Sequence, residues 1–271
     1  MTPAQSGQIG INVITLPIQT PSQMKTSSSR IRGFSLIELL VVVFIIAIIA
    51  TFVALAAPSI LRGSQLAQGS QILADQVSLA RQYALSKNHP VEVRFIRFAD
   101  PEVPGEYDPS GGAQPTPNGN YRAIQILETM DAVDPTTGDF VRLPLDKPAL
   151  LPQAIVMNQG VLSTLIKDAS AAPNAPSKIS GVAGGNDPQL PKSVTVNGKA
   201  VPVPYDYVYF RFLPDGSTNL PLQSKSDPNG AWCVTLQNIN DPAKPNTPPP
   251  NFFTLQIDPV SGTIKQFRPG I

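Results

Sequence analysis

The stretch Arg32-Gly33-Phe34-Ser35-Leu36-Ile37-Glu38 holds the residue types and the spacing that could do chemistry. Gly33 has no Cβ, so an extended chain can lie close to a protease backbone there. Glu38 opens an apolar segment, where a carboxylate is costly: insertion scales give roughly 2.5–3.5 kcal/mol for a charge at the centre of a membrane helix. The carboxylate therefore needs a partner, and cleavage before Phe34 would supply one as a new ammonium group.

The same residues have a simpler interpretation as a helix cap. In Ser35-Leu36-Ile37-Glu38, Ser35 fits the N-cap and Glu38 the third helical position of a capping box. Glu38 also suits the positive end of the helix dipole. These effects account for Ser35 and Glu38, but not for Gly33-Phe34 or for the polar leader before them. We therefore favour the cleavage interpretation and keep the cap as its alternative.

The sequence offers no catalytic residue and no metal or cofactor site, and we expect no enzyme. His89 is the single histidine and precedes Pro90 at an expected helix end, where a solvated or capping role is simplest. The single cysteine, Cys233, follows Trp232 in an expected strand, and we expect it to be a small buried hydrophobe. Ligand clusters typical of metal sites are missing from the sequence pattern.

A long helix must position the N-terminal stretch. Leu39–Ala57 carries no charge, and 19 such residues in a helix span roughly 28 Å, about the thickness of a bilayer core. Residues 1–33 carry three basic residues and no acid, whereas the rest carries 17 basic and 19 acidic residues, a net charge of −2. The basic flank predicts a cytoplasmic N-terminus. Its members are Lys25, Arg30 and Arg32.

After Pro58 the helical pattern becomes amphipathic. One face is small and apolar, which predicts packing on the chain's own sheet; its residues are Leu66, Ser70, Leu73, Val77, Ala80 and Ala84. Asn88 and Pro90 predict the helix end. We expect one helix from near Ser35 to Lys87, with Pro58 and Gly63 as kink points.

The remaining sequence predicts strands and loops, and hence an α+β fold with a C-terminal antiparallel sheet. Asn197-Gly198 marks a two-residue hairpin. The expected strands cover Val91–Phe95, Tyr121–Glu128, Val194–Val196, Lys199–Val201, Tyr205–Leu213, Trp232–Leu236, Phe252–Ile257 and Thr263–Phe267. The expected loops are Asp100–Asn120, Asp168–Pro191 and Asp241–Pro250.

The N-terminal stretch resembles the class III signal of type IV prepilins and pseudopilins, which combines Gly-Phe, a placed glutamate and an unbroken apolar helix. The resemblance implies a pilin-like fold, cleavage between Gly33 and Phe34, and N-methylation of Phe34. It also implies that Glu38 pairs with the N-terminal amine of a neighbouring subunit.

Further segments narrow the resemblance. Residues 72–76, 80–84 and 88–91, with Phe212-Leu213-Pro214-Asp215-Gly216 and Ile257-Asp258-Pro259-Val260-Ser261-Gly262, resemble the type II secretion H and FimT-like minor pseudopilins. Residues 61–66, 91–95 and 98–102 are most similar to the Verru_Chthon cassette protein D family.

This resemblance implies a minor pilin or pseudopilin, a structural subunit of a type IV pilus or of a type II secretion-like pseudopilus. Its expected segments are a leader (1–33), a transmembrane and assembly helix (34–58), an amphipathic helix (59–90) and a β-rich domain (91–271). The implied partners are a prepilin peptidase, other pilin subunits, the inner-membrane assembly platform and membrane lipid. The implied location is the inner membrane, with the globular domain outside the cytoplasm, and then a filament.

Two alternatives belong to other classes. FimT-like relatives can act in DNA uptake, but nucleic-acid binding is not favoured, because phosphate needs clustered basic residues. One local set of basic residues is modest in size and is interrupted by Glu92; its members are Arg81, Lys87, Arg94 and Arg97. An ordinary signal peptide cut after Ala54-Leu55-Ala56 would instead release a secreted β-rich protein. The apolar run, however, exceeds the ~7–15 residues of such signals.

Overall fold

In the 271-residue chain, the computed structural model describes residues 34–103, 106, 119–133, 135, 138, 140–167, 177–181, 193–196, 199–203, 205–223, 230–241 and 247–269. For residues 52–60, 177–181, 194–196, 199, 201 and 202 it describes the backbone only. The predicted leader, 1–33, thus lies outside the described residues. Two compact units divide the chain, Met1–Phe52 and Val53–Ile271.

The first element is the helix α1, Leu36–Lys87, which confirms the single long helix predicted from the sequence. It ends where Asn88 adopts a left-handed conformation, φ 56°, as the predicted C-terminal cap requires. Pro58, where a kink was expected, lies in residues 52–60, for which the structure describes the backbone but not the side chains. Gly63 lies within α1, with nothing within 4 Å of the place a Cβ would occupy.

The predicted strands are confirmed with small changes at their ends. The observed strands at these places are β1 (Val91–Phe98), β2 (Asn120–Val133), β7 (Ser193–Val196), β8 (Lys199–Pro202), β9 (Tyr205–Phe212), β10 (Trp232–Asn238), β11 (Phe252–Ile257) and β12 (Ile264–Phe267). Five further short elements were not predicted from the sequence: β3 (Phe140–Pro144), β4 (Ala149–Leu150), β5 (Ile155–Met157), α2 (Thr164–Lys167) and β6 (Ser177–Gly181).

One of these elements corrects a prediction. β6 lies inside Asp168–Pro191, which was expected to be a loop throughout, and it pairs along β9 from Ser177↔Tyr209 to Gly181↔Tyr205. Its sequence, SKISG, is short and rich in small residues, so its strand propensity is weak. The neighbouring strand, rather than the local sequence, sets its conformation.

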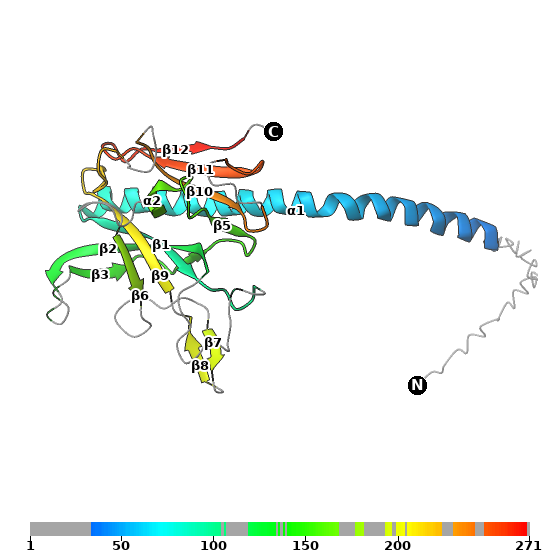
Figure 1. Ribbon diagram of the computed structural model, residues 1–271, viewed down its shortest axis with the longest axis horizontal. Coiled ribbons are helices and arrows are strands. Elements are labelled where there is room, and N and C mark those ends of the chain that lie inside the picture. The colour runs from blue at the N-terminus through cyan, green and yellow to red at the C-terminus, as the bar shows by residue number, and fades with distance from the viewer. Residues whose placement is uncertain are drawn as a thin grey trace, which may run out of the picture. The chain divides into compact units, whose positions relative to one another are not determined.

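The sheet is antiparallel throughout and has the order β12-β11-β10-β5-β2-β1-β9-β6, with β3 and β4 also paired to β2. The predicted hairpin forms a separate two-stranded sheet, β7-β8. The chain therefore has the predicted α+β architecture, an N-terminal helix followed by an antiparallel β-domain (Figure 1).

The second half of α1 lies against the β-domain (Figure 1). Its buried side chains and those of the sheet form one hydrophobic core. Leu66, Leu73, Val77, Ala80 and Ala84 are at most 1% exposed, which confirms the predicted stripe, although Ser70 is only half-buried. A Cβ built on the buried Gly69 would lie 3.1 Å from Ile155 Cγ2. This glycine, which the sequence analysis did not single out, lets β5 approach the helix closely.

Candidate processing and assembly site

The start of α1 is a reciprocal capping box. The Glu38 backbone N–H donates to Ser35 Oγ at 3.2 Å, and the Ser35 backbone N–H donates to Glu38 Oε2 at 3.0 Å. Phe34 precedes the box and is 72% exposed. Gly33, on the other side of the predicted scissile bond, lies outside the described residues. The predicted capping box is thus present. Its hydrogen bonds hold the Glu38 carboxylate beside the backbone N–H of Ser35.

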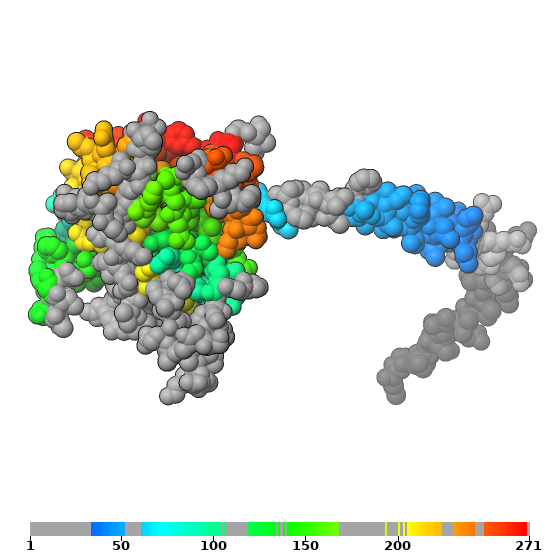
Figure 2. Space-filling model, in the orientation of Figure 1, coloured from blue at the N-terminus to red at the C-terminus, as the bar shows by residue number. Residues whose placement is uncertain are grey.

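An apolar helical surface follows the cap. Every described side chain from Phe34 to Thr51 is exposed (Figure 2, blue). The large hydrophobic residues among them are Phe34, Leu36, Ile37, Leu39, Leu40, Val41, Val42, Val43, Phe44, Ile45, Ile46, Ile48 and Ile49. Such a surface, apolar all round, requires lipid or other helices around it.

In the part of the chain that the structure describes, no helix has an apolar stretch long enough to cross a membrane. The predicted segment Leu39–Ala57 runs into residues 52–60, whose side chains lie outside that part.

The single histidine and the single cysteine are both engaged differently from the predictions. His89 Nδ1 lies 3.0 Å from Glu128 Oε1, so the ring links the α1–β1 corner to β2 instead of standing in solvent. Cys233 is half-buried rather than buried, and its thiol donates to the Leu162 carbonyl at 3.5 Å. No group of three or more metal-ligating side chains occurs among the described residues.

The four basic residues considered for DNA binding do not form a shared exposed surface. Arg94 is completely buried, and Arg97 makes a bidentate pair with Asp206. Arg81 donates to two backbone carbonyls, and only Lys87 is exposed. The three arginines therefore make contacts within the domain, and Lys87 alone among the four residues presents an exposed charge.

The pKa of Tyr121, which lies beside the Arg97–Asp206 ion pair, is shifted. The Arg97 guanidinium lies 5.8 Å from the centre of the Tyr121 ring. Burial raises the pKa of Tyr121 to about 12, and the Asp206 carboxylate acts in the same direction while Arg97 opposes it.

Glu92 is the centre of a charged cluster that the sequence analysis missed. Its fully buried carboxylate accepts from Arg94 Nε at 2.7 Å, from Arg142 Nε at 3.2 Å and from Arg211 Nη2 at 3.0 Å. The Arg94 and Arg211 guanidinium groups lie over the rings of Tyr207 and Tyr209, at 4.1 and 5.2 Å. Both faces of β1 are therefore buried, the apolar face and the face that carries Glu92 and Arg94.

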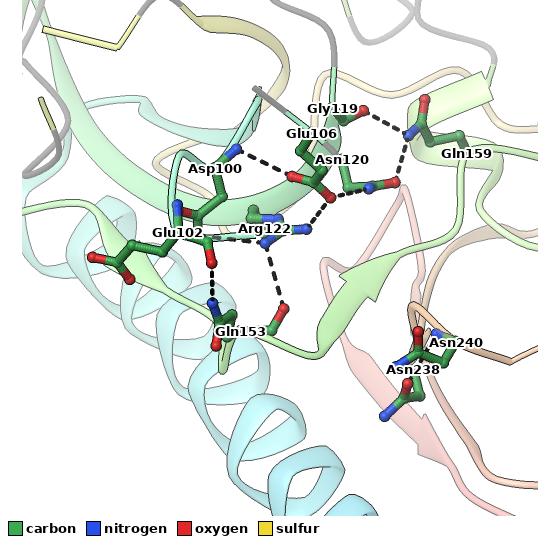
Figure 3. A network of polar contacts seen from close by, with 10 residues as sticks. All are labelled: Asp100, Glu102, Glu106, Gly119, Asn120, Arg122, Gln153, Gln159, Asn238 and Asn240. Carbon is green, nitrogen blue, oxygen red and sulfur yellow. Dashed lines mark hydrogen bonds and ion pairs between the residues drawn. The ribbon is translucent and has the colours of Figure 1, made fainter. Parts of the chain in front are cut away.

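A second polar network closes the base of the predicted loop Asp100–Asn120 (Figure 3). Arg122 is 2% exposed and donates to Glu106 Oε1 at 2.5 Å and to Asp100 Oδ2 at 3.4 Å. Glu106 also accepts from the Asp100 backbone N–H and from Asn120 Nδ2. These bonds hold Asp100 and Asn120, the two ends of the predicted loop, close together. The network therefore stabilises the fold at this place.

The two C-terminal segments that carried the resemblance meet at α1. Arg81 Nη2 donates to the Ser261 carbonyl at 3.0 Å and Arg81 Nε to the Gly216 carbonyl at 3.4 Å. Asp215 and Asp258 shape the two turns by accepting hydrogen bonds from Ser217 and from the backbone of Val260 and Ser261, respectively. These hydrogen bonds lower the pKa of both carboxyl groups, that of Asp215 mainly through the Ser217 hydroxyl.

Comparison with known proteins finds a short but specific match. The family described as the prokaryotic N-terminal methylation motif matches residues 28–54, a range that contains Gly33, Phe34 and Glu38. A comparison with curated proteins finds no match. The motif supports a pilin or pseudopilin subunit over a secreted protein with an ordinary signal peptide.

Two solved structures are similar, both of the minor pseudopilin EpsH from the type II secretion system of Vibrio cholerae. The first is 10% identical, with a TM-score of 0.34 over 76% of this chain and 99% of that one. The second is also 10% identical, with a TM-score of 0.33 over 77% and 97%. Likeness of this degree carries no argument about fold or function.

Proposed function

We propose that this chain is a minor pilin or pseudopilin, a structural subunit of a type IV pilus or of a type II secretion-like pseudopilus. The observation that carries the proposal is the N-terminal methylation motif at residues 28–54. It includes the first part of α1, where every described side chain from Phe34 to Thr51 is exposed and most are apolar. A soluble monomer would leave that surface in water, whereas a filament or a bilayer buries it.

The proposed organisation follows the motif. A prepilin peptidase removes residues 1–33 and methylates Phe34, residues 34–58 anchor the subunit in the inner membrane, and residues 59–90 carry the β-rich domain 91–271 outside the cytoplasm. The partners are the peptidase, other pilin subunits, the assembly platform and membrane lipid. Within the class, the segments 61–66, 91–95 and 98–102 favour the Verru_Chthon cassette protein D family.

The role proposed here is structural rather than catalytic. The proposal rests on the motif and on no catalytic group. His89 joins the α1–β1 corner to Glu128 of β2, and the Cys233 thiol donates to the Leu162 carbonyl. α1 also continues through Ala54-Leu55-Ala56, where an ordinary signal peptide would be cut.

Incorporation into filaments tests the proposal. Glu38→Ala should leave the leader cleavable but reduce co-purification with filaments at least tenfold, because the carboxylate that pairs with a neighbouring amine is gone. Ser35→Ala is the matched control, since it removes only the cap hydroxyl, at a cost of about 1 kcal/mol of helix stability. Failure of the wild-type chain to co-purify with filaments would overturn the proposal. Normal incorporation of Glu38→Ala would instead show that the carboxylate acts only as a helix cap.

A further inference from the structure

We draw no further inference here: the strongest candidate, the buried polar cluster around Glu92, beside which the side chains of Gln125 and Thr129 on β2 have no hydrogen-bond partner, carries none, because nothing in the described part of the chain shows what covers that face of the sheet.

Discussion

Gly262 lies where the two C-terminal turns touch. It has φ +62°, and a Cβ built on it would fall 2.0 Å from the Gly216 carbonyl oxygen, which is a backbone atom. Arg81 bonds to the same carbonyl from α1. One residue without a side chain therefore allows the helix and both turns to meet.

Gly262→Ala should lower the unfolding free energy by on the order of 3 kcal/mol, because left-handed strain and a backbone clash add together. Gly138→Ala is the matched control. Gly138 also has a left-handed φ, +73°, but nothing lies within 4 Å of its Cβ position. It should cost only about 1–2 kcal/mol. Chemical denaturation of the domain from about Gln65 onward measures both, and equal costs would contradict the close contact.

Leu73 has no exposed surface and lies in the core between α1 and the sheet. Leu73→Asp buries a charge without a partner and should cost about 3–5 kcal/mol, enough to unfold a marginal domain. Gln68→Asp, a change at an exposed position five residues earlier in α1, should alter the unfolding free energy by no more than about 0.5 kcal/mol. If Leu73→Asp melts at the wild-type temperature, the stripe is not core.

At the scale of elements, the turn from β11 to β12 depends on a carboxylate. Asp258 Oδ1 accepts from the backbone N–H groups of Val260 and Ser261, both at 2.9 Å, and these bonds lower its pKa. A carboxyl group whose pKa falls on folding stabilises the folded state above its unfolded pKa of ~3.9. That contribution is lost as the pH falls through the lower, folded value.

Asp258→Asn should therefore melt below wild type at pH 7, and the two melting curves should converge as the pH is lowered from about 4 to 2. The amide can still accept a hydrogen bond but carries no charge. Asp215→Asn should behave in the same way, because Ser217 lowers the pKa of that group as well. A difference in melting temperature that does not change with pH would contradict the charged turn.

The periodicity of apolar residues along the sequence predicted the long helix and the longer strands, because the residues within each of these elements favour its conformation. α1 and strands such as β9 carry long apolar periodicities, so their bounds were nearly correct. The missed β3–β6 have two to five residues each and form only because neighbouring strands offer backbone partners. The local sequence contains too little of that information.

The same limit applies to the charged clusters. Glu92 and Arg94 were visible as an alternating pair, but Arg142 and Arg211, which share the carboxylate, are 50 and 119 residues away. Only the strand pairing brings them together. The capping box, by contrast, involves residues three apart, so the sequence predicted it correctly.

At the scale of the whole molecule, the two halves of α1 differ in how much of their apolar surface the chain itself buries. The half in the unit Val53–Ile271 places one stripe in the core and leaves polar residues such as Gln68 and Gln71 exposed. The described half in Met1–Phe52 has no buried side chain at all. The β-domain buries its own apolar side chains, whereas the described N-terminal part of α1 leaves its apolar side chains exposed. This arrangement suits a subunit whose N-terminal helix is buried by lipid or by other subunits.

The N-terminal mass of the mature chain tests this account most directly. Co-expression with a prepilin peptidase should yield a chain shortened by residues 1–33, beginning at Phe34 and carrying one added methyl group. A catalytically inactive peptidase should leave the chain at full length. An intact leader beside the active peptidase, or a chain that begins after Ala56, would contradict the assignment to the pilin and pseudopilin class.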